Sequence, residues 1–328
     1  SELQAFVPPS TSTEQTELIQ LLVSNGMIIT GDEDERLFAE TREQLKHAIS
    51  LELLYLLVTD GCNLRCTYCF EETPSHIGKF RPMRMSDETV VKSLNLYADL
   101  ATLYGNPDKK KVIHFYGGEP LVNRKAVYKA VEYIDTLKEL GRLPASCQST
   151  IVTNGTLLNR EDAEFFAKHQ VTVGLSIDGP AFITDHYRIP KRHGVHVTDR
   201  VLDSFRLLKQ YGVGVGLSVT LTPDALTHFD EFLDFFTHGE LRQADGVSLN
   251  LLHFTPNVVL SDDHYHTAVE CQIKAFNRFR DLGIYEERVM RKVRAFVDQT
   301  PMYADCGVVG YQLVVAPDGR IGACQDFI

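Results

Sequence analysis

The chain has 328 residues, of which 44% are hydrophobic and 23% charged, a composition typical of a globular protein with ample material for a core. Its formal net charge of −11 at pH 7 argues against a nucleic-acid groove, because such a groove needs a basic face to neutralise phosphates. Since no apolar run approaches the length of a bilayer span and the first residues lack a signal peptide, we expect a cytoplasmic protein without a membrane partner.

Residues 1–50 are predicted to form an N-terminal helical extension. A polar segment over 8–13 precedes a short amphipathic helix over 14–24, and the Asn-Gly pair at 25–26 ends that helix. A second helix is predicted within 31–50. Because no motif here carries chemistry, a helical lid or linker is the favoured interpretation, with the remnant of a peptide-recognition domain as the alternative.

The apolar run 51–58 leads into Cys62, Cys66 and Cys69, spaced C-x-x-x-C-x-x-C. Three thiolates in so short a loop cannot all pair as disulfides, and together they form a soft-metal cage. Iron–sulfur clusters normally take four cysteines, so three either find a fourth elsewhere or leave one iron open for a ligand. A zinc site or three buried structural cysteines are the alternatives, although zinc usually takes four ligands from paired spacings.

From residue 51 onward, apolar runs alternate with amphipathic helices. Six strands are predicted at 53–59, 111–116, 149–153, 172–177, 214–221 and 247–254. Helices are predicted between and after them at 86–103, 124–140, 160–169, 199–211, 225–238, 262–282 and 286–298. This alternation indicates an α/β fold whose parallel sheet is closed, or nearly closed, into a barrel. Sites in such barrels lie at the carboxyl ends of the strands.

Gly117-Gly118-Glu119 follows the second strand, one β/α unit after the cysteine loop. Together with Tyr68, the aromatic residue just before the third cysteine, this arrangement resembles the radical S-adenosylmethionine (SAM) superfamily. The resemblance implies a partial (β/α)6 TIM-like barrel. It also implies a 4Fe-4S cluster on the three loop cysteines, with SAM chelating the open iron. One electron from the cluster then cleaves SAM to methionine and a 5′-deoxyadenosyl radical, which takes a hydrogen atom from the substrate.

The resemblance also assigns SAM contacts at the ends of the strands. Glu119 and the backbone near Gly117 and Gly118, where glycine permits a close approach, would hold the SAM ammonium. Asn154 would lie near the aminoacyl or ribose group, and Ser176 would contact the ribose; each is otherwise an ordinary loop or strand-end residue.

Three further residues are assigned in the same way. Arg188 would meet the SAM carboxylate, because a guanidinium is the natural bidentate partner of a carboxylate, with an exposed surface arginine as the alternative. Leu221 would sit beside the adenine, with a core leucine as the alternative. Asp178 is a candidate acid or base.

The C-terminal segment places Cys306 and Cys324 on either side of a predicted hairpin whose turn is 316–319. This pattern resembles the opening half of a SPASM domain, which binds auxiliary 4Fe-4S clusters, and the further cysteines of that family would follow Ile328. The predicted division is therefore 1–50 helical extension, 51–255 partial barrel, 256–300 helical linker and 301–328 incomplete SPASM-like segment.

Together the two resemblances indicate the branch of anaerobic sulfatase-maturating enzymes and ribosomal-peptide maturases. The implied substrate is a peptide or protein residue, oxidised or crosslinked after hydrogen abstraction, with flavodoxin or ferredoxin as electron donor. Three alternatives stay open: a radical SAM enzyme acting on a small molecule or RNA, a non-enzymatic iron–sulfur redox protein, and a zinc-stabilised binding module.

Overall fold

The computed structural model describes residues 12–24, 31–47, 49–69, 82–192, 194–252, 255, 257–300, 304 and 306–325. The predictions for the polar segment before residue 12, for the helix end at 25–26 and for the strand end at 253–254 lie outside the described residues. The chain divides into two compact units, residues 1–49 with 301–305, and residues 50–300 with 306–328. The predicted linker 256–300 and most of the C-terminal segment therefore cluster with the sheet.

The first unit contains both predicted helices of the extension. They are α1, Thr13–Ser24, and α2, Gly31–His47. The first turn of α2 carries three acidic residues, Asp32, Glu33 and Asp34. Their negative charges stabilise the helix because they lie at the positive end of its dipole. The described side chains of α2 are almost all exposed.

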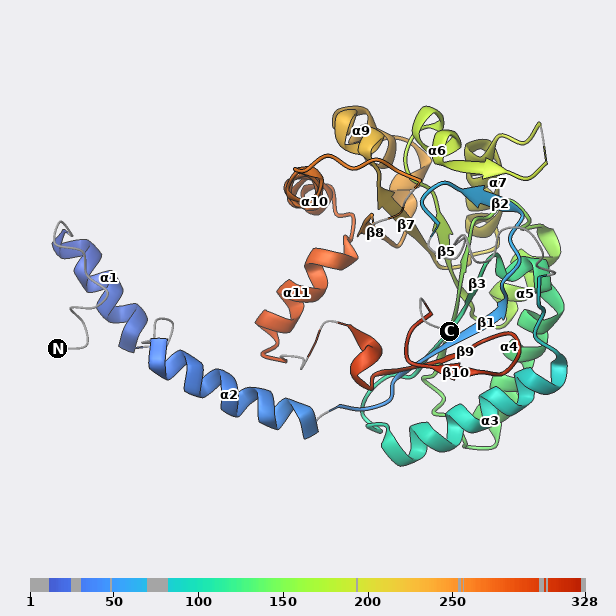
Figure 1. The fold of residues 1–328 in the computed structure, drawn as a ribbon, viewed down its shortest axis with the longest axis horizontal. Coiled ribbons are helices and arrows are strands. Elements are labelled where there is room, and N and C mark those ends of the chain that lie inside the picture. The colour runs from blue at the N-terminus through green and yellow to red at the C-terminus, as the bar shows by residue number, and fades with distance from the viewer. Residues whose placement is uncertain are drawn as a thin grey trace. The chain divides into compact units, whose positions relative to one another are not determined.

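The second unit is built on one eight-stranded sheet with the order β10-β9-β1-β3-β4-β5-β7-β8 (Figure 1). Its strands are β1 Leu53–Thr59, β3 Val112–Gly117, β4 Gln148–Thr153, β5 Thr172–Ser176, β7 Val215–Leu221, β8 Gly246–Leu251, β9 Gln312–Val315 and β10 Ile321–Gly322. All neighbours run parallel except β9 and β10. The six predicted strands form in chain order, which confirms the α/β class. Within the described residues the sheet is open, with β10 and β8 at its edges.

Helices connect the strands of this sheet. They are α3 Asp87–Tyr104, α4 Arg124–Glu139, α5 Arg160–Lys168, α6 Ala181–Tyr187, α7 Val197–Gln210, α8 Pro223–Thr227, α9 Phe229–Thr237, α10 His264–Asp281 and α11 Glu287–Val297. The prediction of a single helix over 225–238 is wrong, because the backbone of His228, at φ −110° and ψ 46°, leaves the helical region between α8 and α9. No helix within the described part of the chain is long and apolar enough to cross a membrane.

The two faces of the sheet differ in composition. One face carries large apolar residues that are fully buried, including Leu54, Leu56, Ile113, Phe115, Ile151, Leu175, Leu217 and Leu249. The other face mixes apolar residues such as Leu53 and Leu57 on β1 with polar and small residues, and most of its side chains are half-buried. On β5, β7 and β8 it presents two rows in register, the glycines Gly174, Gly216 and Gly246, and the serines Ser176, Ser218 and Ser248. Short side chains leave room in front of this face.

The C-terminal hairpin extends the sheet at the β1 edge. β9 pairs in parallel with β1, with Gln312 opposite Leu53 and Val315 opposite Leu56. The predicted turn forms, since Gly319 donates its N–H to the carbonyl of Ala316 at 2.9 Å. The segment that carries the last two cysteines therefore lies beside the strand that leads into the cysteine loop.

Candidate active site

The cysteine loop follows β1 and is fixed by a small second sheet. Its middle forms β2, Leu64–Cys66, which pairs antiparallel with β6, Arg188–Pro190, so that Cys66 lies opposite Arg188. The loop then turns, with the N–H of Cys69 donating to the Cys66 carbonyl at 3.1 Å. Among the described residues no disulfide involves these sulfurs. The loop therefore offers its sulfurs from a defined backbone.

The sulfur of Cys62 has polar neighbours that suit a metal-bound thiolate. It accepts hydrogen bonds from the backbone N–H of Leu64 at 3.4 Å and from Asn154 Nδ2 at 3.8 Å. The same Asn154 amide donates to Asn63 Oδ1 at 3.0 Å, while its oxygen accepts from the Thr156 N–H at 3.0 Å. The loop after β4 thus holds Asn154 against the cysteine loop.

Burial raises the pKa of Cys62 and of Cys66 to about 12. Both are therefore thiols at neutral pH, and binding of an iron cluster must displace their protons. Each cysteine of a 4Fe-4S cluster binds a different iron, so the sulfurs stay farther apart than the ligands of a single ion. Within the described part of the chain no three His, Cys, Asp or Glu side chains gather closely enough to hold one metal ion. Three cysteines are one fewer than a 4Fe-4S cluster normally takes, so a cluster bound to this loop would have one iron open to another ligand.

The two glycines at the end of β3, Gly117 and Gly118, pack against the cysteine loop and the strand end before it. Gly118 donates to the carbonyl of Thr59, and Glu119 donates to the carbonyl of Gly61, both at 2.9 Å. A Cβ on Gly118 would lie 2.5 Å from the Gly61 oxygen, and one on Gly117, whose φ is +127°, would lie 2.0 Å from the Thr59 oxygen. These positions require glycine because two backbone segments touch there.

Glu119 is 1% exposed and joins the ends of β3 and β4. Its Oε1 accepts from the Leu121 N–H at 3.0 Å and from Thr153 Oγ1 at 2.7 Å, and its Oε2 accepts from the Asn154 N–H at 2.8 Å. Burial raises the pKa of Glu119, and these hydrogen bonds oppose the rise. A carboxylate can accept about four hydrogen bonds, so these three leave capacity for one more donor.

Asp178 and Arg188 form a buried ion pair. Arg188 donates from Nε to Oδ2 at 2.8 Å and from Nη2 to Oδ1 at 2.9 Å. The Tyr68 hydroxyl donates to Oδ2 at 2.5 Å, and the Thr220 N–H donates to Oδ1 at 3.0 Å. Asp178 is 0% exposed and Arg188 is 6% exposed, so the alternative of a surface arginine is wrong. Because its carboxylate is buried and paired, we assign Asp178 no acid–base role.

The other two predicted SAM contacts differ in exposure. Ser176 ends β5 on the half-buried face, opposite Ser218 of β7. Leu221 ends β7 with its side chain 0% exposed, as its alternative interpretation predicted. A ligand at this strand end could therefore meet the backbone of Leu221 and not its side chain.

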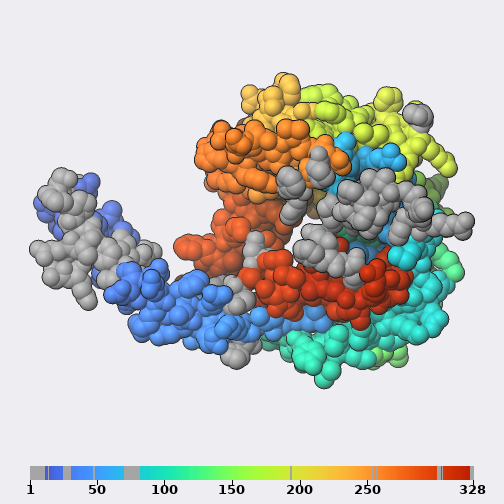
Figure 2. All heavy atoms as spheres, viewed as in Figure 1, coloured from blue at the N-terminus to red at the C-terminus, as the bar shows by residue number. Residues whose placement is uncertain are grey.

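Cys306 is exposed and Cys324 is half-buried, and no disulfide joins them in the described residues. They flank the β9–β10 hairpin, which Gln312 closes by donating to the Ala323 carbonyl at 2.6 Å. Burial raises the pKa of Tyr55 on β1, and the charges of Arg288 and Arg291 oppose that rise. Figure 2 shows the C-terminal segment, in red, on one surface of the molecule.

Sequence reasoning missed His114 and Thr150 on the half-buried face, whereas it named Asn250 on the sixth strand as a residue that could point into the barrel. The ring of His114 on β3 stacks on Tyr55 at 4.9 Å and shares a hydrogen bond with Thr150 on β4. On β8, Asn250 donates to Ser218 Oγ at 3.2 Å and accepts from Arg288 Nε of α11 at 3.0 Å. The alternation of apolar and polar residues within each strand is the signal that could have identified the strand residues.

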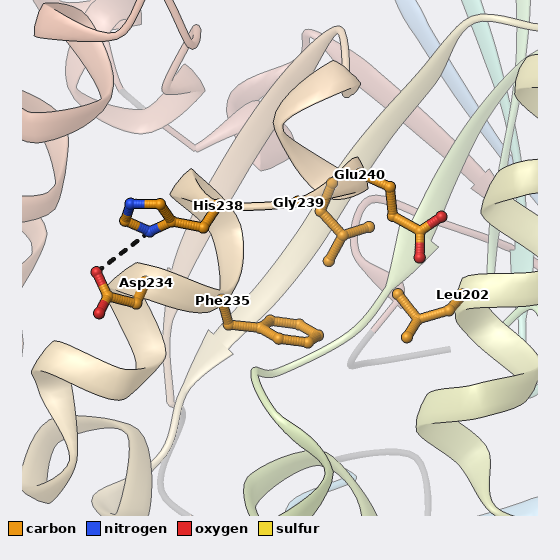
Figure 3. A pocket seen from close by; sticks show the side chains of 7 residues that line it. Leu202, Asp234, Phe235, His238, Gly239 and Glu240 are labelled. Atoms are coloured by element: carbon orange, nitrogen blue, oxygen red, sulfur yellow. Dashed lines mark ion pairs between the residues drawn. The ribbon is translucent and has the colours of Figure 1, made fainter.

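A separate cavity of about 430 Å³ lies between α7 and α9 (Figure 3). Leu202 and Phe235 line it, and His238 Nδ1 lies 3.4 Å from Asp234 Oδ1 at its edge. None of its lining residues belongs to the strand ends that carry the cysteine loop. We therefore place the candidate active site at the cysteine loop and not at this cavity.

A parallel α/β sheet with three loop cysteines at the carboxyl end of its first strand, faced by a Gly-Gly-Glu turn, defines the radical SAM class. The radical SAM superfamily profile matches residues 56–236, and the chain belongs to that superfamily. Members of the superfamily use a 4Fe-4S cluster and SAM.

Several curated relatives are anaerobic sulfatase-maturating enzymes. A serine-type enzyme of Bacteroides thetaiotaomicron is 35% identical over 208 residues, which cover 63% of this chain and 47% of that protein. A cysteine-type enzyme of Clostridium novyi is 27% identical over 197 residues, which cover 59% of this chain and 50% of that protein. The chain thus spans about half the length of these relatives.

Solved structures show the same fold. A structure described as native anSMEcpe with bound AdoMet has a TM-score of 0.69 and 21% identity, covering 85% of this chain and 75% of that chain. Streptococcus suis SuiB bound to the precursor peptide SuiA has a TM-score of 0.60 and 17% identity, covering 92% of this chain and 66% of that chain.

Proposed function

We propose that this chain carries the catalytic part of a radical SAM enzyme that modifies a residue of a peptide or protein. The observation that carries the proposal is the cysteine loop, whose backbone is fixed by the pairing of β2 with β6 and by the glycine turn at the end of β3. When bound, the cluster and SAM supply a 5′-deoxyadenosyl radical that removes a hydrogen atom from the substrate. The protein then contributes binding, orientation and electrostatics.

The residues around the loop have distinct roles in this proposal. Cys62, Cys66 and Cys69 bind the cluster. Glu119 accepts from the SAM ammonium with its remaining capacity, which suits a carboxylate buried beside the loop. Asn154 fixes Cys62 and lies at the edge where the aminoacyl end of SAM would bind.

Further contacts would secure the rest of SAM. Ser176 contacts the ribose from the end of β5, and the backbone of Leu221 lies beside the adenine. Arg188 binds Asp178 through two N–H groups, and a guanidinium has five, so further donors can serve the SAM carboxylate.

A peptide substrate is supported by the relatives and by the sheet. The matched relatives mature sulfatases, and SuiB was solved with a precursor peptide. The half-buried face presents glycine and serine rows that leave space and hydrogen-bonding groups for a polypeptide. The modification itself would be a side-chain oxidation, a thioether or a carbon–carbon crosslink, with flavodoxin or ferredoxin supplying the electron.

The test is anaerobic purification, reconstitution with iron and sulfide, reduction, and chromatographic detection of 5′-deoxyadenosine after SAM is added. The variant Cys62→Ala, Cys66→Ala, Cys69→Ala serves as the control, and a variant with Cys147→Ala and Cys271→Ala tests whether the effect is specific to the loop. We expect product from the unchanged protein and from the second variant only. A fully loaded protein that makes no product would contradict the proposed activity.

A further inference from the structure

The structure contains two buried networks of the same chemistry. In one, Asp178 accepts from Arg188 and from the Tyr68 hydroxyl. In the other, Asp162 accepts from Arg124 Nε at 2.5 Å and Nη2 at 2.9 Å and from the Tyr128 hydroxyl at 2.8 Å. Both aspartates are 0% exposed. The two networks differ in what they connect.

The Asp162 network joins two outer helices. Arg124 begins α4, Tyr128 lies one turn later, and Asp162 lies in the first turn of α5, where it also accepts from the backbone N–H of Asn159 at 2.9 Å. Arg124 also donates from Nη2 to the Leu157 carbonyl at 2.8 Å, and within the described residues no hydrogen bond or ion pair links this network to the cysteine loop. The role of this network is therefore to dock one helix on another.

The Asp178 network joins four segments that meet at the cysteine loop. Tyr68 lies between the second and third loop cysteines, and Arg188 begins β6, where it pairs with Cys66. Asp178 follows β5, and the Thr220 N–H that donates to it belongs to β7. One carboxylate thus fixes the tip of the loop and the strand opposite Cys66 to the ends of two sheet strands.

Building on the proposed function, we propose that Asp178 is a positioning residue for the cluster loop and for SAM. It holds the Tyr68 hydroxyl, which fixes the loop between Cys66 and Cys69, and it orients the Arg188 guanidinium. Removing one partner of a buried ion pair leaves the other charge without compensation, so the arginine would turn away and the loop would loosen. Hydrogen-bonding partners behind a metal site commonly change metal affinity or activity by about tenfold to a hundredfold when they are replaced.

The chain offers matched controls for this proposal. Asp178→Asn and Tyr68→Phe perturb the loop network, whereas Asp162→Asn and Tyr128→Phe make the same chemical changes in the helix network. Tyr68→Phe removes one hydroxyl and keeps the ring, so it provides a mild variant should Asp178→Asn fail to fold. Any general effect of breaking a Tyr–Asp–Arg network appears in both pairs.

The first measurement is mass-spectrometric alkylation of the metal-free protein. We expect Cys66 and Cys69 to react roughly threefold faster or more in Asp178→Asn and Tyr68→Phe, as a locally loosened loop would, and at the unchanged rate in both control variants. Cys147 and Cys271 are buried elsewhere and serve as internal references. Equal rates at Cys66 and Cys69 in the unchanged protein and in Tyr68→Phe would overturn the proposal.

The second measurement is electron paramagnetic resonance of the reconstituted, reduced cluster during a titration with SAM. We expect Asp178→Asn to need about tenfold more SAM for the spectral change, with Tyr68→Phe affected less and the controls unaffected. If the unchanged protein responds and Asp178→Asn responds identically, the positioning role is wrong while the proposed function stands. If the unchanged, fully loaded protein shows no response to SAM, the proposed function fails and the role toward SAM fails with it.

Discussion

Glu119 illustrates how one buried side chain can serve both the fold and a cofactor. It accepts hydrogen bonds from Leu121, Thr153 and Asn154, so it fixes the turn after β3 to the end of β4. Glu286 has an equivalent environment far along the chain. It is also 1% exposed and accepts from the N–H groups of Leu249, Arg288 and Val289.

This pair gives a residue-scale prediction. Glu119→Gln and Glu286→Gln each turn an acceptor into a donor that faces another N–H, so each should lower the free energy of unfolding by about 1 to 3 kcal/mol. Only Glu119→Gln should weaken SAM binding, because only Glu119 borders the cysteine loop. Denaturant unfolding of the metal-free protein and a SAM titration of the reconstituted protein check this. Equal SAM affinity in the two variants would refute the assignment of Glu119.

His114 predicts a pH dependence of stability. Burial lowers the pKa of His114 from its ordinary value of 6.5 to about 4, so the unfolded chain binds more protons than the folded chain between these values. The stabilisation is complete above about pH 6.5 and is lost as the pH falls toward 4. From pH 7 to pH 5 this group should cost about 2 kcal/mol of unfolding free energy.

The check is urea unfolding of the metal-free protein at both pH values, compared with His114→Gln, which keeps a polar partner for Thr150. The unchanged protein should lose about 2 kcal/mol more than the variant on acidification. Parallel losses in the two proteins would show that His114 titrates in the folded state near its ordinary pKa.

At the scale of elements, the turn at the end of β3 and the cysteine loop pack directly against each other. Their backbones touch at Gly118, where an added Cβ would meet the oxygen of Gly61 at 2.5 Å and that of Asp60 at 2.8 Å. Both oxygens belong to backbone carbonyls, which cannot turn aside as a side chain could. The two segments would therefore have to separate to accommodate a methyl group at position 118. Gly216, in the glycine row, has its nearest such contact at 3.7 Å, which is an ordinary distance.

We therefore expect Gly118→Ala to lower the unfolding free energy by about 1 to 3 kcal/mol and to reduce cluster loading. Gly216→Ala should retain cluster loading, since its side chain meets no close neighbour. Iron and sulfide analysis after reconstitution, beside thermal unfolding of the metal-free forms, separates the two effects. Full loading of Gly118→Ala would show that the two segments can move apart without disturbing the cysteines.

At the scale of the whole molecule, the C-terminal hairpin brings a second pair of cysteines to the β1 edge of the sheet. We propose that Cys306 and Cys324 contribute to an auxiliary 4Fe-4S cluster. Iron and sulfide would then fall in a Cys306→Ala, Cys324→Ala variant while the signal of the loop cluster persists. An unchanged iron content in that variant would show that Cys306 and Cys324 do not contribute to cluster binding by this chain.

The six strands in order and the three loop cysteines could be predicted, because alternating burial and short-range spacing are written locally in the chain. The small β2–β6 sheet could not be, since strands of three residues have no periodicity. The bond between Asp178 and Tyr68 joins residues 110 positions apart, and no local pattern encodes it. The pairing of the C-terminal hairpin with β1 depends on which strand of the folded sheet has an edge free to pair, and that is set by the tertiary structure.

The sequence by itself therefore determined the superfamily resemblance and the α/β class, and it predicted the residues for the cluster, because these depend on residue type and spacing. Only the tertiary structure showed which partners the rim residues contact. It turned Asp178 from a candidate acid or base into the buried partner of Arg188, and it showed that Gly117 and Gly118 are required by contact between backbones. Those roles depend on burial and on partners brought together from distant strands, which only the folded chain defines.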